Sequence, residues 1–164
     1  MKIVKIVVVV LAAIFAGMQF YRPGKNLGEQ DPSKDISAAL EVPEDVGAVL
    51  RESCYDCHSN STRYPWYAEV MPAGWWLDGH IQDAKRQLNF SEFAAGSLRR
   101  QYHKLEEIAE QVGEGEMPLP SYLILHSGAA LSGAEKDMLL GWAEASRASM
   151  KARYPADSLE RRRD

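Results

Sequence analysis

The sequence has little of several features that mark common classes of protein. Cysteine occurs only twice in 164 residues, as Cys54 and Cys57. The formal net charge is −4, and because phosphate binding requires a concentrated basic face, we expect no nucleic-acid partner. The alternation of apolar and polar residues that marks β-strands is absent, and so is any internal repeat. The expected fold class is therefore all-α, with one small domain.

The N-terminal end carries a long apolar run. Lys2 precedes this run, and Lys5 lies near its start. Residues 6–18 carry no charge, and Phe20 and Tyr21 follow them. A short basic region before about a dozen apolar residues is typical of a secretory signal, and the whole run approaches the roughly 20 residues that span a bilayer. Lysines stay on the cytoplasmic side, and aromatic residues suit the interface. We predict an uncleaved single-pass anchor helix in a bacterial inner membrane over residues 1–21, with the domain facing the periplasm; a cleaved signal is the alternative.

Composition divides the rest of the chain into three parts. Residues 22–42 are rich in Pro, Gly, Asn, Asp and Ser, and they predict a tether. Residues 43–150 carry four stretches of helical periodicity and predict the folded domain, with a capping box formed by Ser132 and Glu135 at the start of the last stretch. Residues 151–164, which include three consecutive arginines, predict a flexible tail.

The segment Cys54-Tyr55-Asp56-Cys57-His58 has the spacing of a covalent haem attachment site. Two thiols three positions apart can reach the two vinyl groups of one porphyrin, and the next residue then projects beneath the centre of the ring. Attachment of this kind takes place outside the cytoplasm, in agreement with the predicted export. The sequence therefore predicts one covalently bound haem c per chain, with His58 as an axial ligand of the iron.

Other uses of the two cysteines stay open. An oxidising compartment would permit a disulfide between Cys54 and Cys57, and the same pair could form a thiol redox site. Thioredoxin-type sites follow a β-strand, however, and no strand is predicted before Cys54. A zinc site made of the two cysteines and two histidines is a further alternative.

The second face of the iron has six candidate ligands: Met71, His80, His103, Met117, His126 and Met138. Met117 precedes Pro118 in a loop expected between two helices, where an extended backbone can present a thioether to the iron. Met138 lies on the apolar face of the last helix and is expected in the core, His103 is expected to be a solvated helix residue, and His126 a structural one. We therefore predict His58 and Met117 as the two metal ligands.

A cluster of aromatic residues follows the cysteine motif: Tyr64, Trp66, Tyr67, Trp75 and Trp76. Aromatic side chains supply much of the buried area of a small domain, so a place in the core is one interpretation. They also suit the dry wall of a cofactor crevice, which limits the access of water and tunes the redox potential. We expect Trp66 and Trp76 to contact the haem in such a wall.

Two resemblances add to this interpretation. The order of the cysteine motif, the Met-Pro loop and a last helix with residues 131–135 and Trp142 resembles class I cytochromes c, in which that methionine is the sixth ligand. Residues 43–146, with the N-terminal run, are more specifically similar to a bacterial family called the haem-binding domain. The positions that carry this similarity are Cys54, Cys57, His58, residues 59–67, Trp75, Trp76, His80, residues 88–91, Met117, Pro118, Tyr122 and His126.

This resemblance implies a small, cytochrome c-like helical domain around one haem. It also keeps His80 as a second candidate for the sixth ligand, because Trp75, Trp76 and His80 match the family's Trp-Trp-x-x-x-His pattern. A pair of histidines would give the iron a lower potential than a histidine with a methionine.

Three functions follow from these alternatives. A six-coordinate haem predicts a single-haem electron carrier rather than an enzyme, with a redox partner protein that the sequence does not identify. An open or displaceable distal site predicts instead a haem enzyme, such as a peroxidase, or a gas or redox sensor. A disulfide-bearing interaction module without haem is the third.

Overall fold

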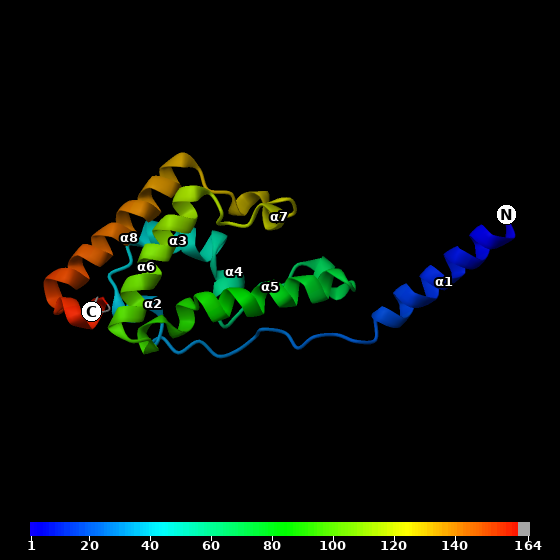
Figure 1. The fold of residues 1–164 in the computed structure, drawn as a ribbon, viewed down its shortest axis with the longest axis horizontal. Helices are drawn as coiled ribbons and strands as arrows, with labels where there is room; N and C mark the ends of the chain where they lie inside the picture. Colours follow the sequence, from blue (N-terminus) through cyan, green and yellow to red (C-terminus); the bar gives the residue numbers. More distant parts are fainter. Residues whose placement is uncertain (161–164) are drawn as a thin grey trace.

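The computed structural model describes residues 1–160, and in this part of the chain every regular element is a helix (Figure 1). The expected all-α fold is confirmed. The elements in chain order are α1 (Lys2–Met18), α2 (Ile36–Ala39), α3 (Glu44–Ser53), α4 (Tyr55–His58), the 3-10 helix η1 (Trp66–Glu69), α5 (Ala73–Gln87), the 3-10 helix η2 (Phe90–Ala95), α6 (Leu98–Glu114), α7 (Pro120–Leu123), the 3-10 helix η3 (Ser127–Ala129), α8 (Gly133–Arg153) and α9 (Ala156–Leu159).

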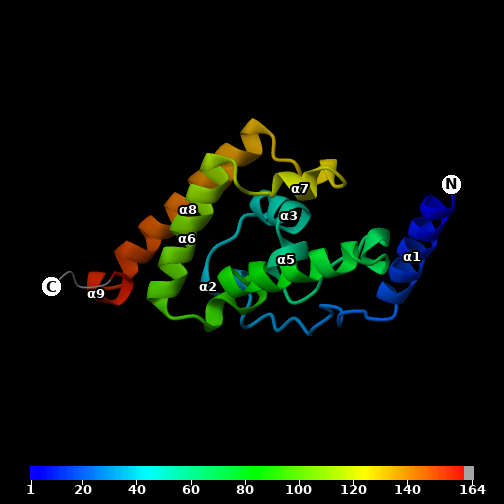
Figure 2. The same cartoon turned by 45° about the vertical axis from the view of Figure 1, so that its right-hand side comes forward.

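The main core lies between the long helices α6 and α8, which run side by side (Figure 2). Leu105 of α6 and Leu139 and Ala143 of α8 are buried in it. Leu50 of α3 belongs to the same cluster and is 1% exposed. Because burial of an apolar side chain is the main force that fixes one element against another, α3 is held firmly on the α6–α8 pair. The cysteine motif follows directly at the C-terminal end of α3.

The ends of α6 and α8 show why these helices begin and stop where they do. Ser132 and Glu135 form the capping box expected from the sequence: the Glu135 N–H donates to the Ser132 hydroxyl at 3.3 Å, and the Ser132 N–H donates to the Glu135 carboxylate at 2.7 Å. Gly115 ends α6 with a φ of +79°, a left-handed conformation that favours glycine. The chain therefore turns out of α6 two residues before Met117.

Helix α1 carries the apolar run of the N-terminus, and its side chains are mostly exposed. No helix in residues 1–160 is long and apolar enough to cross a membrane. The expected spanning anchor is therefore not supported, since α1 contains 17 residues where a bilayer needs about 20.

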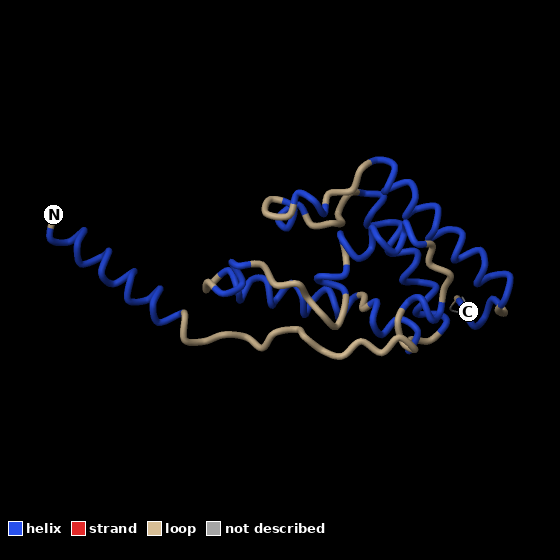
Figure 3. The backbone as a smooth tube through the Cα atoms, turned by 180° about the vertical axis from the view of Figure 1, so that it is seen from behind, coloured by secondary structure: helices blue, strands red, loops and turns tan. Residues whose placement is uncertain are grey.

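The segment predicted as a tether runs along the domain (Figure 3) and is buried against it at Asn26 and Ile36. Asn26 is buried, and its side-chain amide donates to the Ser59 carbonyl and to the Thr62 hydroxyl, both at 2.9 Å. Ile36 of α2 is 1% exposed and belongs to the main core. Residues 22–42 therefore help to hold the loop that follows the cysteine motif.

Packed structure also continues beyond residue 150, where the sequence predicts a flexible tail. Helix α8 extends to Arg153, and Leu159 of α9 is buried in the main core. Residues 161–164, which include the three arginines of the predicted tail, lie outside the described residues.

Candidate functional site

The cysteine motif begins where α3 ends. The Cys54 N–H closes the last turn of α3 by donating to the Leu50 carbonyl at 2.9 Å. The Cys54 carbonyl in turn accepts from the N–H groups of Cys57 and His58, at 3.2 and 3.0 Å. These bonds form the short helix α4 and fix both thiols and the imidazole on a single turn of backbone. In the described residues neither thiol forms a disulfide.

Both thiols lie in apolar surroundings that keep them protonated. Burial raises the pKa of Cys54 from its ordinary value of 9.0 to about 12, with a smaller contribution from Cys57. Burial also raises the pKa of Cys57 to about 11, and the nearby Asp56 carboxylate adds to the effect. Such thiols are poor nucleophiles towards solvent reagents, which argues against a thiol redox site.

His58 is oriented by a backbone carbonyl. Its Nδ1 lies 3.0 Å from the carbonyl oxygen of Leu88, at the end of α5. A carbonyl only accepts hydrogen bonds, so Nδ1 carries the proton and Nε2 keeps its lone pair. Burial lowers the pKa of His58, although the hydrogen bond to Leu88 acts in the opposite direction. The ring is thus held neutral with one nitrogen free, which is the arrangement found in metal-binding histidines.

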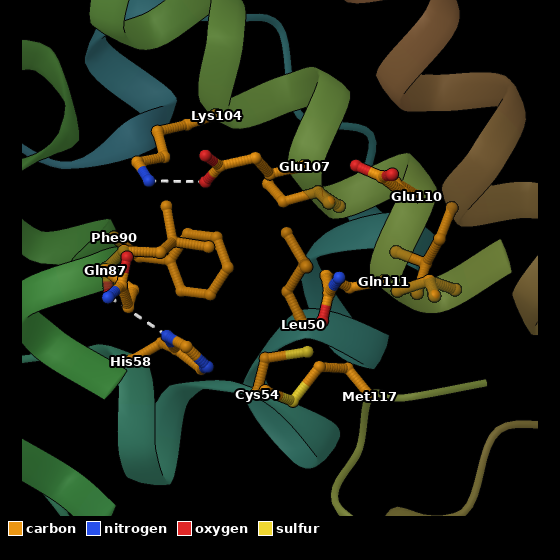
Figure 4. A pocket seen from close by; sticks show the side chains of 14 residues that line it. Leu50, Cys54, His58, Gln87, Phe90, Lys104, Glu107, Glu110, Gln111 and Met117 are labelled. Carbon is orange, nitrogen blue, oxygen red and sulfur yellow. Dashed lines mark hydrogen bonds and ion pairs between the residues drawn. The ribbon is translucent and has the colours of Figure 1, made fainter. Parts of the chain in front are cut away.

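A cavity of about 380 Å³, which we call the main cavity, opens beside this imidazole (Figure 4). The volume is within the usual range for small-molecule sites. Its walls come from α3, the cysteine motif, the α5–η2 junction, α6, the Met117 loop and α8. The lining residues are Leu50, Cys54, His58, Gln87, Leu88, Phe90, Lys104, Glu107, Ile108, Glu110, Gln111, Val112, Met117 and Leu139.

A second, smaller cavity of about 40 Å³, the thiol-side cavity, shares Cys54, His58 and Met117 with the main cavity. It adds Cys57 and His80 to the walls. Five of the seven side chains predicted from the sequence to bind the cofactor therefore come together around two adjoining spaces.

Met117 reaches both cavities because of the way α6 ends. After the left-handed Gly115, the N–H groups of Glu116 and Met117 both donate to the Gln111 carbonyl, at 3.0 and 3.2 Å. The chain is thereby folded back towards α4, and Figure 4 shows the Met117 side chain next to Cys54.

His80 projects from α5 on the thiol side. Its Nδ1 lies 2.8 Å from the Trp76 carbonyl, so Nδ1 is again the donor and Nε2 is free. The Trp76 ring lies 4.1 Å from the His80 ring, centroid to centroid, and Trp76 is 42% exposed. Trp76 therefore contacts a cavity residue at the edge of the site.

Trp66 does not take the place predicted for it. It is 78% exposed and lines neither cavity, and its ring meets the edge of Tyr67. The reason is its position at the first residue of η1, where Tyr67, and not Trp66, turns inward and is buried.

The remaining candidate ligands lie elsewhere. Met71 is buried and lines neither cavity. His103 is exposed and pairs with Glu107 at 3.0 Å, His126 stacks on Tyr122, and Met138 packs against the main core. No group of three or more His, Cys, Asp or Glu side chains in residues 1–160 is arranged to hold a metal ion, so the alternative zinc site is not supported there.

One wall of the main cavity was not predicted. Lys104, Glu107, Ile108 and Gln111 line it from α6. Their positions i, i+3, i+4 and i+7 share one helix face, so the periodicity was a usable signal. Three of the four are polar, and a mixed face of this kind is more typical of a solvated surface than of a binding wall.

Comparison with known proteins agrees with this geometry. A family described as haem-binding domain matches residues 13–145, and the chain belongs to that family. No curated protein and no solved structure matches the chain. The arrangement of residues fits a haem group, because two thiols, an imidazole with a free Nε2 and a largely apolar cavity meet at one place.

Proposed function

We propose that this protein is a periplasmic c-type haem protein that transfers single electrons. One haem is bound covalently through Cys54 and Cys57, and His58 and Met117 are its axial ligands. Each thiol S–H adds across a vinyl C=C bond, which forms a C–S and a C–H bond with no leaving group and no external oxidant. The bound haem supplies one-electron chemistry at its iron.

The observation that carries this proposal is the hydrogen bond from His58 to the Leu88 carbonyl. It leaves Nε2 as the coordinating atom and fixes the ring plane from a second element of the fold. A histidine held in this way one residue after Cys57 matches the requirement of a c-type site for an axial ligand next to the second thioether.

Met117 is the preferred sixth ligand because of where it lies. It borders the main cavity and the thiol-side cavity together with Cys54 and His58, whereas His80 borders only the smaller one. With both axial positions taken by protein side chains, no position is left open for a substrate. This favours electron transfer over a haem enzyme or a gas sensor.

The N-terminal segment is the basis for the proposed periplasmic location. Lys2 and Lys5 with the uncharged residues 6–18 have the pattern of a secretory signal. Thioether formation on a Cys-x-x-Cys-His segment takes place outside the cytoplasm, so export and attachment are proposed together. Cell fractionation should recover the haem-bearing chain with the periplasmic or membrane fraction, and recovery in the cytoplasm alone would contradict the location.

Visible spectra test the ligands directly. Protein made in a host with a c-type haem maturation system should give a low-spin spectrum, and Met117→Ala should turn it high-spin because the thioether is lost. Met138→Leu and His103→Ala are matched controls, since neither residue lines a cavity. A high-spin change in His80→Ala, with none in Met117→Ala, would assign the sixth ligand to His80.

A further inference from the structure

A third cavity adjoins the main one at the α5–α6 junction, and we call it the basic cavity. It measures about 290 Å³. The two spaces share three wall residues, Gln87, Leu88 and Lys104. The complete lining of the basic cavity is Lys85, Gln87, Leu88, Asn89, Glu92, Phe93, Ala95, Gly96, Arg100, Gln101 and Lys104.

The charges of this lining favour an anion. Lys85, Arg100 and Lys104 are basic, and Glu92 is the acidic residue among the lining side chains. Lys85 is already engaged, because it donates to the side-chain carbonyl of Asn26 at 2.5 Å. Arg100 makes a long contact of 3.4 Å with the Arg86 carbonyl. The guanidinium of Arg100 therefore keeps most of its donors for other partners.

Lys104 is the cation that both cavities share. Its side chain is only 13% exposed, and its ammonium pairs with the Glu107 carboxylate one turn further along α6. Glu107 is 36% exposed and lines the main cavity. A mostly buried lysine with a single carboxylate partner retains two N–H donors for other partners.

Lys104 also lies far from the thiols within the main cavity. Figure 4 shows Lys104 and Cys54 at opposite ends of it, with Phe90 and Leu50 between them. Haem carries its two vinyl groups on one edge of the porphyrin and its two propionates on the other. A porphyrin joined to Cys54 and Cys57 by its vinyl edge therefore directs its carboxylates towards the Lys104 end.

We propose that the basic cavity receives the haem propionates, with Lys104 and Arg100 as the cations that bind them. This inference rests on the proposed function and adds the orientation of the haem to it. His80 and His126 are not the propionate partners, because His80 borders the thiol-side cavity and His126 lines none of the three. In this arrangement the ammonium of Lys104 forms ion pairs with both the Glu107 carboxylate and a propionate.

The test uses the haem-bearing protein and compares Lys104→Gln with Lys104→Arg. Lys151→Gln is the control for loss of one positive charge, since Lys151 is exposed and lines none of the three cavities. The midpoint potential is measured by spectroelectrochemistry. Infrared difference spectra between the oxidised and reduced forms report the propionate carboxylates.

Lys104→Gln should lower the equilibrium constant for reduction about tenfold, which is about 59 mV for a one-electron couple, because a cation next to the haem favours the added electron. Its propionate carboxylate bands should shift, while Lys104→Arg and Lys151→Gln leave the bands close to those of the wild type. If Lys104→Gln fails to retain haem while Lys104→Arg and the control variant retain it, the result would also support the proposal. The positive charge at position 104 would then be needed for the incorporation of haem.

Two results would overturn the assignment. The first is a coloured Lys104→Gln protein with unchanged potential and bands. The second is a shift in potential without any shift of the carboxylate bands. That result would show that Lys104 acts on the iron only as a distant charge and does not contact the propionates. A colourless wild-type protein would overturn the proposed function itself, so the two failures are distinguishable.

Discussion

The hydroxyl of Tyr122 donates a hydrogen bond to Oδ2 of Asp56 at 3.3 Å, although the two residues are 66 positions apart. Burial raises the pKa of Tyr122 above its ordinary value, so the phenol stays protonated and remains a donor. Asp56 lies between the two cysteines, and Tyr122 lies in α7, directly after the Met117 loop. The contact therefore ties the loop of the proposed sixth ligand to the attachment site.

Removal of this hydroxyl should loosen the loop without removing a ligand. In Tyr122→Phe we expect added imidazole to replace Met117 on the iron several-fold and up to about tenfold more tightly than in the wild type, because the net contribution of one hydrogen bond is about 0.5–1.5 kcal/mol. Spectral titration with imidazole measures this. Tyr154→Phe is the control, since Tyr154 lines neither cavity around the iron ligands, and equal imidazole affinity in both variants would contradict the role of the contact.

The parts of the site that the sequence predicts well are those that depend on local spacing. The cysteine motif, the loop around Met117 and the capping box of Ser132 with Glu135 all lie in short segments, and the structure places them as expected. Each rests on bonds between residues no more than six positions apart. Patterns of that kind are visible in a single sequence.

The parts that the sequence does not predict depend on contacts between distant segments. The carbonyl that orients His58 belongs to Leu88, and any residue type could have supplied it. Asn26 is buried against the loop that follows the cysteine motif, although the composition of residues 22–42 is typical of a tether. Trp66 is exposed because the geometry of η1 turns its neighbour inward. The spacing of apolar and polar residues in the sequence does not indicate any of these three contacts.

Two glycines of α5 should respond in opposite ways to substitution by alanine. A Cβ at Gly74 would lie 2.4 Å from the Ala68 carbonyl oxygen, so Gly74→Ala should destabilise the protein by about 1–3 kcal/mol. A Cβ at Gly79 would meet nothing within 4 Å, and Gly79→Ala should stabilise it by about 0.5–1 kcal/mol through helix propensity. Chemical denaturation measures both; the same sign for the two would refute the close approach of the Ala68 carbonyl to Gly74.

Phe90 supports the imidazole from the side of η2. Its ring stacks on Tyr55 at 4.9 Å and meets the edge of His58 at 6.1 Å, and it is 1% exposed. Phe90→Ala should therefore cost about 3–5 kcal/mol of unfolding free energy. Phe20→Ala serves as the control, because Phe20 is 90% exposed and its loss should change stability by less than about 0.5 kcal/mol. Similar losses in both variants would be inconsistent with the buried position of Phe90.

The thiols of the haem-free chain should react slowly with alkylating reagents. At pH 8, a pKa of about 11 at Cys57 gives about 100-fold less thiolate than the ordinary value of 9.0. Cys54, with a pKa of about 12, should react about tenfold more slowly still. Mass spectrometry after timed alkylation with iodoacetamide follows each site, and denatured chain is the reference. Equal rates in folded and denatured chain would show that the thiols are not buried.

The same raised pKa values predict how stability depends on pH. Because the folded chain holds these protons more tightly than the unfolded chain, their contribution is complete below pH 9. It is lost as the pH rises towards the folded values of about 11 and 12. Denaturation of the haem-free chain should accordingly become easier above pH 9, and the double variant Cys54→Ser/Cys57→Ser should lose this part of the alkaline dependence.

The proposed function depends on the covalent attachment of one haem, which the intact mass of the purified protein measures. Chain made with a c-type haem maturation system should carry the added mass of a single haem after denaturation in acid, and Cys54→Ser/Cys57→Ser should carry none. Coloured protein that loses its haem on denaturation, or wild-type chain at its unmodified mass, would contradict the covalent attachment of haem.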